Sequence, residues 1–388
     1  MKILWVALLA LLISSCSRFI AGPQDKGTNT PLADAILTNI ELADSAALSC
    51  GRDSLPKCLE VHVMNVKQGS SAVAILPDGT SLLFDAGGSD YNAKALFISK
   101  LNDLLPDDDY VDILVLSHSD NDHTNMLNIS EKLNASKLKA IHLSGTPDNY
   151  ARKIAAKEFM EKLYSGEIPK SIAGCDSNKK VEAKIYCYPS KYTPNSPIQE
   201  GMPYSREKGL YSYILVANAD AEAGTTPTSS NANSLISAIS YGSTKILFMG
   251  DGEGVTTAQV MNESPQYMRS NTSVYVMAHH GSSTKNSNNI AWLQDIEPRS
   301  LIASSGIHKR WRHPDEGLIT TIIHTLGSTI LNTGQHNIYL AKGTDRCQKK
   351  INKAIYTTVT NGTILFKSDG NRFIIKPEYS ELIGLHNC

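Results

Sequence analysis

Two histidines and two aspartates lie within six residues of this sequence, in the order His118, Asp120, Asp122 and His123. Imidazole nitrogens and carboxylate oxygens are common ligands of zinc and related divalent cations. His118 and Asp120 are two residues apart and can point the same way, so one loop can reach two neighbouring ions. The alternative is a polar turn in which the histidines are incidental. Because four ligand-type side chains in six residues are a dense cluster, we predict a metal site.

The residues before this cluster predict the element that positions it. The segment 111–116 is apolar and rich in β-branched residues, so the cluster should follow the end of a buried strand. Two later predicted strands also end in ligand-type residues, namely Asp251 and the pair His279 and His280. Taken alone, these residues fit a simple turn and a helix cap. Because sites form where strand ends meet, we expect all three groups to converge.

The remaining pattern alternates strands with helices. Strands are predicted at 59–66, 71–76, 81–85, 139–143, 211–217, 235–241, 245–249, 274–278 and 300–306, with β structure from 338 to 376. Helices are predicted at about 93–104, 151–164 and 318–326. This order predicts an α/β or α+β class with layers around sheets. The segment 168–209 is expected to be a loop-rich insertion stapled by a disulfide, and 219–230 a small-residue insertion.

The first fifteen residues are typical of a secretory signal, with one early lysine, a short apolar core and small residues before Cys16. Small residues before a cysteine resemble the bacterial lipoprotein box. This resemblance implies cleavage before Cys16, lipidation of that residue and a membrane anchor, with Ser17 favouring the outer membrane. An ordinary secretory peptide is the alternative, and both interpretations export the protein. We expect a tether at 16–57 and one hydrolase-type domain at 58–388.

The cysteine count agrees with export. Without Cys16, six cysteines are left, and an even number indicates disulfides in an oxidising compartment. Six cysteines allow many pairings, and proximity in the sequence suggests Cys50 with Cys58, Cys175 with Cys187, and Cys347 with Cys388. Zinc-binding thiolates are disfavoured because the chain has no Cys-x-x-Cys motif.

Composition is that of a folded globular protein, with 41% hydrophobic and 19% charged residues among 388. The formal net charge of −1 gives no overall basic field for nucleic acid, so such a substrate would need a local patch. Lys309, Arg310 and Arg312 surround Trp311 and form one candidate. This patch could bind a phosphate backbone and stack a base, although a solvated loop fits it equally well.

These motifs together resemble a known family. The pattern His118-x-Asp120-x-Asp122-His123 resembles the metallo-β-lactamase superfamily motif, in the variant in which aspartate replaces the second histidine. The accompanying segments resemble the extracellular hydrolase domain of ComEC-type competence proteins and stand-alone relatives: 68–69, 84–87, 233–235, 248–251 and 279–282. The resemblance covers about 60–366. It implies an αββα sandwich and a hydrolase with one or two metal ions, usually zinc, with manganese as an alternative.

The resemblance also implies a role for individual residues. The implied metal ligands are His118, Asp120, Asp122, His123, bridging Asp251 and one of His279 and His280, with His279 favoured because it directly ends its strand. Asp85 would orient the ligand loop from behind, and His313 would be a proton donor or phosphate contact near the pocket. Asn233 stands where the third metal motif usually has a histidine, which weakens one metal position. The expected substrate contacts are Ser282, Lys309, Arg310, Trp311 and Arg312.

The expected activity is hydrolysis of a phosphodiester, either DNA or a small molecule. Divalent cations would lower the pKa of a water molecule, supply hydroxide at neutral pH and offset phosphoryl charge, with Asp122 or His313 handling the proton. A lactone, lactam or other ester or amide is the alternative substrate, and the Asp120 variant argues mildly against a lactamase. A non-catalytic, metal-binding envelope lipoprotein is the third hypothesis, which intact ligands at every strand end disfavour.

Overall fold

The computed structural model describes residues 48, 50, 57–188, 209–219, 230–379 and 385–388. The predicted signal, Cys16 and most of the tether lie outside the described residues, as do most of the 219–230 insertion and the second half of 168–209. All described residues belong to one unit, Ile40–Cys388. The domain boundary expected at 57–58 stays a prediction.

Within the described residues, the first sheet has eight strands in the order β16-β15-β1-β2-β3-β4-β5-β6. β1, β2 and β3 are antiparallel, whereas β3 to β6 run parallel. The two C-terminal strands complete this sheet, because β15 pairs with β1 and β16 pairs with β15. The strands are β1 (Leu59–Val63), β2 (Ala72–Ile75), β3 (Ser81–Phe84), β4 (Ile113–Leu116), β5 (Ala140–Ser144), β6 (Lys184–Tyr188), β15 (Ile364–Ser368) and β16 (Phe373–Pro377).

The second sheet of the described residues has six strands in the order β14-β11-β10-β9-β8-β7. Its parallel half, β9, β10, β11 and β14, carries the later strand ends that the sequence singled out. A separate pair, β12 and β13, forms an antiparallel ribbon. The strands are β7 (Leu210–Val216), β8 (Ile236–Tyr241), β9 (Thr244–Phe248), β10 (Val274–Val276), β11 (Leu301–Ala303), β12 (Asn332–Lys342), β13 (Asp345–Lys353) and β14 (Ile355–Thr357).

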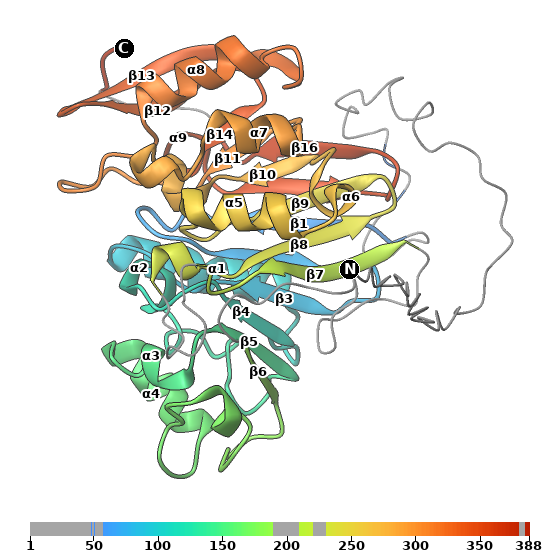
Figure 1. The fold of residues 1–388 in the computed structure, drawn as a ribbon, viewed down its shortest axis with the longest axis vertical. Coiled ribbons are helices and arrows are strands. Elements are labelled where there is room, and N and C mark those ends of the chain that lie inside the picture. Colours follow the sequence, from blue (N-terminus) through green and yellow to red (C-terminus); the bar gives the residue numbers. More distant parts are fainter. Residues whose placement is uncertain (1–47, 49, 51–56, 189–208, 220–229, 380–384) are drawn as a thin grey trace, which may run out of the picture. The chain divides into compact units, whose positions relative to one another are not determined.

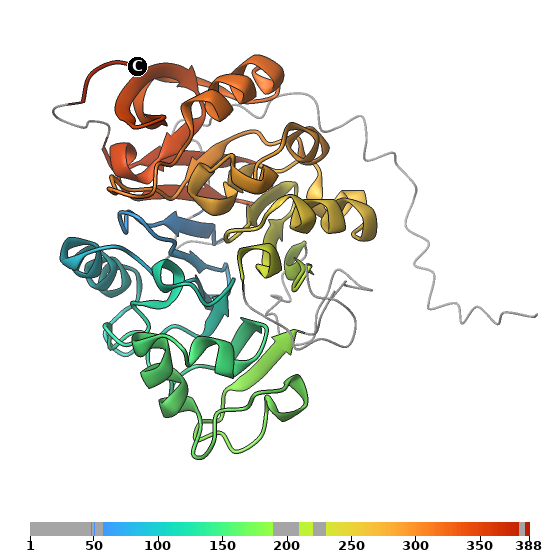
Figure 2. The same cartoon turned by 60° about the vertical axis from the view of Figure 1, so that its left-hand side comes forward.

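Helices cover the outer faces of both sheets. α1 and α4 bury Phe97 and Phe159 against the first sheet, in one core with Leu83 and Leu114. α5, α7 and α8 pack on the second sheet, away from the blue-to-green strands (Figures 1 and 2). The predicted αββα arrangement is therefore confirmed. The helices are α1 (Tyr91–Leu104), α2 (Asn121–Thr124), α3 (Pro147–Tyr150), α4 (Ile154–Leu163), α5 (Gly254–Glu263), α6 (Gln266–Arg269), α7 (Ile290–Ile296), α8 (Glu316–Leu326) and α9 (Thr358–Asn361).

The two sheets are held together by an apolar core between them. Side chains of β3 and β4 alternate, so Leu82, Phe84 and Val115 face the second sheet while their neighbours face the helices. The rings of Phe84 and Phe248 stack with centroids 3.9 Å apart. This contact lies directly before the two strand ends that lead to Asp85 and Asp251, so it fixes the distance between the loops that follow.

The interpretation of 168–209 as loop-rich was incomplete, because its residues Lys184–Tyr188 form β6. This strand is at the edge of its sheet, where only one neighbour and partial burial leave a weak apolar pattern. The helices α5 and α7 were also not predicted. α5 is rich in threonine and small residues, which carry little helical periodicity.

The six described cysteines are joined as their proximity in the sequence suggested. Cys50–Cys58, Cys175–Cys187 and Cys347–Cys388 have Cα–Cα separations of 5.2, 6.2 and 5.0 Å. The second bridge fastens β6 to the loop before it, and the third holds the last residue on β13. None of the helices in the described residues has the length and apolar character needed to cross a membrane.

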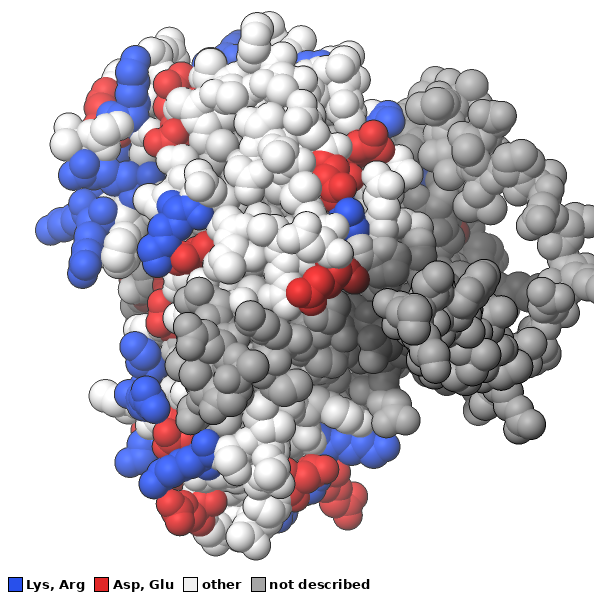
Figure 3. All heavy atoms as spheres, viewed as in Figure 1, with Lys and Arg blue, Asp and Glu red and all other residues white. Residues whose placement is uncertain are grey.

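Charged side chains of both signs are distributed over the described surface. Figure 3 shows Lys and Arg side chains gathered at the upper left edge of that view, over the loop before α8 and the turn between β12 and β13.

Replacing Phe248 with alanine should lower the free energy of unfolding by about 3–5 kcal/mol, because it leaves a cavity between the sheets. Urea unfolding measures this change. Tyr91→Ala is the matched control, since that ring is 82% exposed and its loss should change stability by about 0.5 kcal/mol or less. Equal effects of the two substitutions would contradict the packing of the two sheets.

Candidate metal centre

The His/Asp cluster follows β4 as predicted. The strand ends at Leu116, and α2 begins at Asn121. His118 and His123 are fully buried, with ring centroids 4.2 Å apart. One short loop therefore brings both imidazoles to the same place.

A close backbone contact holds this loop against the turn after β3. A Cβ atom on Gly87 would lie 1.9 Å from the carbonyl oxygen of Asp122, so no larger residue fits there without movement. The amide of Ala86 donates to the His123 carbonyl at 2.8 Å, and that of Ser70 donates to the Asp122 carbonyl at 3.0 Å. This close approach fixes the loop of Asp122 and His123 against the turn that follows β3.

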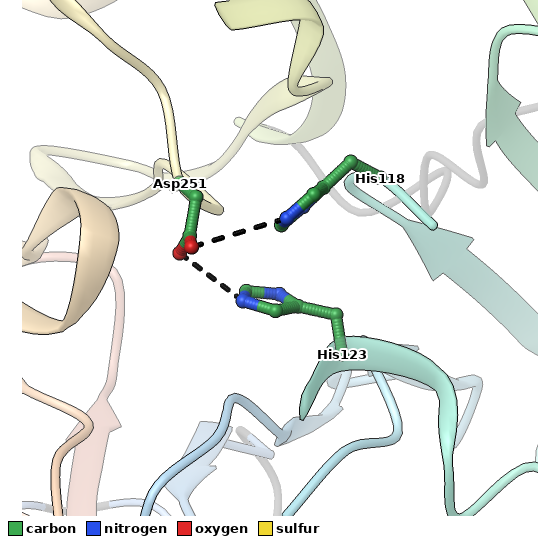
Figure 4. A group of neighbouring side chains, drawn as sticks. All are labelled: His118, His123 and Asp251. Carbon is green, nitrogen blue, oxygen red and sulfur yellow. Dashed lines mark ion pairs between the residues drawn. The ribbon is translucent and has the colours of Figure 1, made fainter. Parts of the chain in front are cut away.

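The second sheet supplies the other side of the centre. Asp251 follows β9, and its amide donates to the Ser234 hydroxyl at 3.1 Å. His279 and His280 follow β10 with φ angles of 50° and 57°, in the left-handed region. Figure 4 shows Asp251 on one side, facing His118 and His123 on the other. The loops of both sheets thus meet, as the strand ends predicted.

The carboxylate of Asp251 lies among four imidazoles. Its Oδ1 is 3.1 Å from Nε2 of His123 and 3.6 Å from Nε2 of His280. Its Oδ2 is 3.9 Å from Nε2 of His118 and 3.8 Å from Nε2 of His279. This position, between histidines of both sheets, is the one expected of a bridging carboxylate.

Hydrogen bonds with Asp85 and Ser117 hold the Nδ1 atoms of His118 and His123. Nδ1 of His123 donates to Oδ2 of Asp85 at 2.7 Å. The Ser117 hydroxyl also donates to Asp85, at 2.7 Å, so its oxygen accepts from Nδ1 of His118 at 3.0 Å. Each Nδ1 therefore carries a proton, which leaves each Nε2 as the atom that can bind a cation. The contacts of Asp85 with His123 and Ser117 are the physical basis of its predicted orienting role. The sequence did not predict that Ser117 contacts His118.

His280 is oriented in the same way from the second sheet. Its Nδ1 donates to the backbone carbonyl of Ser304 at 2.8 Å, and a carbonyl can only accept. Its Nε2 faces Oδ2 of Asp122 at 3.3 Å. A fixed Nδ1 contact that aims Nε2 inward is the usual arrangement of metal-binding histidines.

The donor atoms at the centre fit a divalent cation. Nε2 of His118, His123 and His280 and Oδ1 of Asp251 are buried without a hydrogen-bond partner among the described residues. Two groups bring their donor atoms within 4.8 Å of one another: His118, His123 and Asp251, and Asp122, His123 and His280. Buried polar atoms without partners are costly, and a cation would satisfy them.

The charges of the cluster are coupled. Burial opposes charge on Asp251, but His123 and His280 outweigh it and hold the pKa of Asp251 well below its ordinary value. Burial likewise opposes a proton on His123, yet Asp251 and Asp85 raise the pKa of His123 well above 6.5. The pKa of His280 is also raised, against its burial, by Asp251 and Asp122. The ion-free cluster thus keeps anionic carboxylates and retains protons that a cation would displace.

The preference for His279 over His280 is not supported by this geometry. His280 is 3% exposed and is anchored at Nδ1, whereas the His279 side chain is 19% exposed and belongs to neither ligand group. The left-handed turn is the reason, because it directs the second histidine, not the first, into the space between the sheets. Sequence position at a strand end does not reveal this turn.

Other predicted residues lie at the rim or outside the centre. The Asp120 side chain is 48% exposed, with Oδ2 3.7 Å from Nε2 of His118. The side chain of Asn233 donates to Ser230, and its neighbour Ser234 is the residue that contacts Asp251. The hydroxyl of Ser282 shares a hydrogen bond with Thr284 inside its own loop, and its expected substrate contact stays a prediction.

His313 lies beside the centre, and the basic residues before it are on an exposed loop. Its ring centroid is 5.4 Å from that of His279. Burial and the neighbouring imidazoles of His280 and His279 lower the pKa of His313 to about 4, so it is neutral at pH 7.

The basic loop is held to the β12–β13 turn. The Arg310 guanidinium stacks 4.5 Å above the Trp311 ring, and Arg312 donates to the carbonyl of Gly343 at 3.1 Å. Lys309 is also exposed. These residues therefore form one basic surface that leads along the chain to His313.

Comparisons with known proteins give fold-level similarity. No protein-family model matches the chain, and a search of curated proteins found no match. Among solved structures, the chain is similar to long-form RNase Z from yeast, with 10% identity, a TM-score of 0.43 and coverage of 84% of this chain and 51% of that one. It is also similar to Zn²⁺-bound PqqB from Methylobacterium extorquens, with 12% identity, a TM-score of 0.37 and coverage of 63% and 89%.

A variant of the CmlA β-hydroxylase is similar with 12% identity and a TM-score of 0.36, over 71% of this chain and 52% of that one. This chain thus spans about half the length of the hydroxylase and of the yeast enzyme. At such low similarity, the assignment of function rests on the site itself.

The raised pKa values predict how the stability of the ion-free protein depends on pH. His123 and His280 hold protons in the folded state above their ordinary pKa of 6.5. Their stabilisation is complete below pH 6.5 and is lost as pH rises through the raised values. The melting temperature of the chelator-treated protein should therefore fall as pH increases from 6.5 to about 8.

Asp251→Asn should flatten this dependence, because it removes the charge that raises both pKa values. The window from pH 6.5 to about 8 suits this test, because the histidines with lowered pKa are neutral there in both states. Lys245, whose pKa burial lowers to about 8, acts in the opposite sense only above this window. An unchanged slope in the variant would contradict the charge coupling.

Proposed function

We propose that this protein is an exported, metal-dependent hydrolase that cleaves phosphodiesters with one or two Zn²⁺ ions, or with Mn²⁺. The observation that carries the proposal is the set of three buried imidazoles whose Nδ1 atoms are anchored from behind. Their Nε2 atoms all face the Asp251 carboxylate. Anchored imidazoles around one buried carboxylate are a donor set that suits a divalent cation.

The ligand groups assign the residues that would hold the cations. His118, His123 and Asp251 form one group, and Asp122 and His280 lie on the other side of His123. Nδ1 of His123 is occupied by Asp85, so His123 offers only one nitrogen to the two groups. When bound, divalent cations lower the pKa of water and offset negative charge on phosphoryl oxygens.

Two residues of the chain are placed to act on the substrate or on protons. The pKa of the Asp122 carboxyl is held below its ordinary value, against burial, by the close contact with Nε2 of His280 and the charge of His123. Its side chain is 31% exposed, so it can accept a proton from the open side of the centre. His313, neutral at pH 7, suits hydrogen bonding to a phosphoryl oxygen better than proton donation.

The basic loop supports an anionic substrate. Lys309, Arg310 and Arg312 are exposed on the segment that leads to His313, and the stacked Trp311 ring is 41% exposed. In a chain with a net charge of −1, this local cluster favours a phosphodiester over a neutral lactone or lactam. The substrate is DNA or a smaller phosphodiester.

Export and membrane anchoring are part of the proposal. Three disulfides in the described residues support an oxidising compartment such as the periplasm or the cell surface. We place the lipid on Cys16, with the outer membrane as its location. Mass spectrometry of the N-terminal peptide tests this, and Cys16→Ser should release the protein from membranes; an unmodified Cys16 would contradict the anchor.

Purified protein should contain zinc or manganese by elemental analysis, and His280→Ala should lose more of it than His279→Ala. The reason is that His280 is anchored and buried while His279 is at the rim. We expect His280→Ala to weaken Zn²⁺ binding more than roughly 100-fold, because contacts behind a ligand alone are worth about 10- to 100-fold. Greater loss with His279→Ala would restore the assignment made from sequence.

Linear DNA and bis-p-nitrophenyl phosphate should be cleaved, whereas nitrocefin should not. Asp122→Ala should lower the rate by about 100-fold or more while the fold is retained, because it removes a ligand and a proton acceptor. Asp176→Ala is the matched control, with a side chain 67% exposed beside Lys179. Cleavage of nitrocefin alone would contradict the phosphodiesterase assignment, and full metal occupancy without activity would favour a binding protein.

A further inference from the structure

The turn that aims His280 at the centre needs an external support. His279, His280 and Gly281 have φ angles of 50°, 57° and 85°. The left-handed region is sterically disfavoured for residues with a Cβ atom, and two such residues in succession are rare. Such a conformation persists only where surrounding contacts determine it.

One buried side chain, Asn288, supplies contacts at both ends of this turn and is 1% exposed. Its Oδ1 accepts from the amide of Ala278 at 3.1 Å, and its Nδ2 donates to the carbonyls of Ala278 at 2.8 Å and Ser282 at 2.7 Å. The side chain thus binds the residue before the left-handed turn and the residue after it. The backbone adds two hydrogen bonds, from the amide of His279 to the carbonyl of Gly250 at 3.0 Å and from the amide of Asp315 to the carbonyl of Gly281 at 3.1 Å. The Asn288 amide group joins the two ends of the turn to each other.

A second contact orients Asn288 itself. The hydroxyl of Tyr275 donates to Oδ1 of Asn288 at 2.9 Å and accepts from Nε1 of Trp292 at 3.3 Å. Both rings are fully buried, Tyr275 on β10 and Trp292 on α7. The two acceptor and two donor positions of the Asn288 amide are therefore all used, which only an uncharged amide can satisfy.

We propose that Asn288 is a positioning residue for the metal centre, which selects His280 over His279 as the inward ligand by bracketing the left-handed turn. Asn288 binds the main chain on either side of the turn, while the Ser304 carbonyl fixes the rotation of the His280 ring. Ser304 is in turn held by its hydroxyl, which donates to the carbonyl of Gly69 on the first sheet at 2.8 Å. This inference rests on the proposed function, because its consequence is cation affinity.

Asn288→Asp tests the proposal with almost no change in volume. The substitution keeps the acceptor for Ala278 and Tyr275 but turns the donor into an oxygen that faces two carbonyls. We expect Zn²⁺ affinity, measured by competition with a chromophoric chelator, to fall roughly 10- to 100-fold. The visible spectrum of the Co²⁺ form should also change, because its bands report the number and geometry of ligands.

Asn289→Ala is the matched control for a purely structural effect. Asn289 is the neighbouring asparagine and caps α7 through the Trp292 amide, without a contact to residues 278–282 in the described structure. Its loss should lower the melting temperature and leave Zn²⁺ affinity and the Co²⁺ spectrum unchanged. If Asn288→Asp does not fold, Tyr275→Phe carries the test, with an expected loss of affinity below about 10-fold.

The outcomes separate the inference from the proposed function. Wild-type protein that binds neither Zn²⁺ nor Co²⁺ would overturn both. Wild-type protein that binds them, with unchanged affinity and spectrum in Asn288→Asp or in its substitute Tyr275→Phe, would overturn the inference alone. An equal loss of affinity in Asn289→Ala would also overturn it, because the effect would then follow stability and not the turn.

Discussion

The buried carboxylate of Asp251 is the constraint on which the centre depends. An anion removed from water needs compensating charge or hydrogen bonds, and here the described residues offer four imidazoles within 4 Å. The protons on His123 and His280 compensate that charge in the ion-free protein. Cations and protons therefore compete for the same imidazole nitrogens. The stability of the folded protein should for this reason depend on both pH and cation binding.

The centre belongs to neither sheet alone. The first sheet contributes two histidines from one loop, and the second contributes Asp251 and His280 from two others. The loops are bound together by close backbone contacts, such as the approach of Gly87 to Asp122, and by side chains that bind carbonyls, such as the hydroxyl of Ser304 on Gly69. The stacked rings of Phe84 and Phe248 set the spacing beneath them. The separation of the donor atoms is thus a property of the sheet packing.

The electrostatics change from the interior of the centre to its rim. Inside, anionic carboxylates and anchored imidazoles leave lone pairs and negative charge for a cation. At the rim, His313 is neutral because burial and its neighbours lower its pKa to about 4. Beyond it, the loop of Lys309, Arg310 and Arg312 is positive. An anionic ester bound across this gradient would have its charge facing the basic loop and its reacting group near the centre.

Sequence patterns alone determined the layered class, the principal strands, the cysteine pairs and the residues that gather at the strand ends. These features follow from local periodicity, from adjacency in the chain and from the chemistry of side-chain types. Only the tertiary structure decided which histidine has its Nε2 beside Asp122. The reason is that the left-handed turn at His279 and His280 is held by hydrogen bonds with Asn288, Gly250 and Asp315, which lie outside it. The tertiary structure also revealed that Ser117 and Ser304 orient His118 and His280, since neither serine has a sequence signal of its own. The local sequence pattern indicates which side chains can bind a metal ion, but their orientation depends on hydrogen bonds from elements distant in the chain.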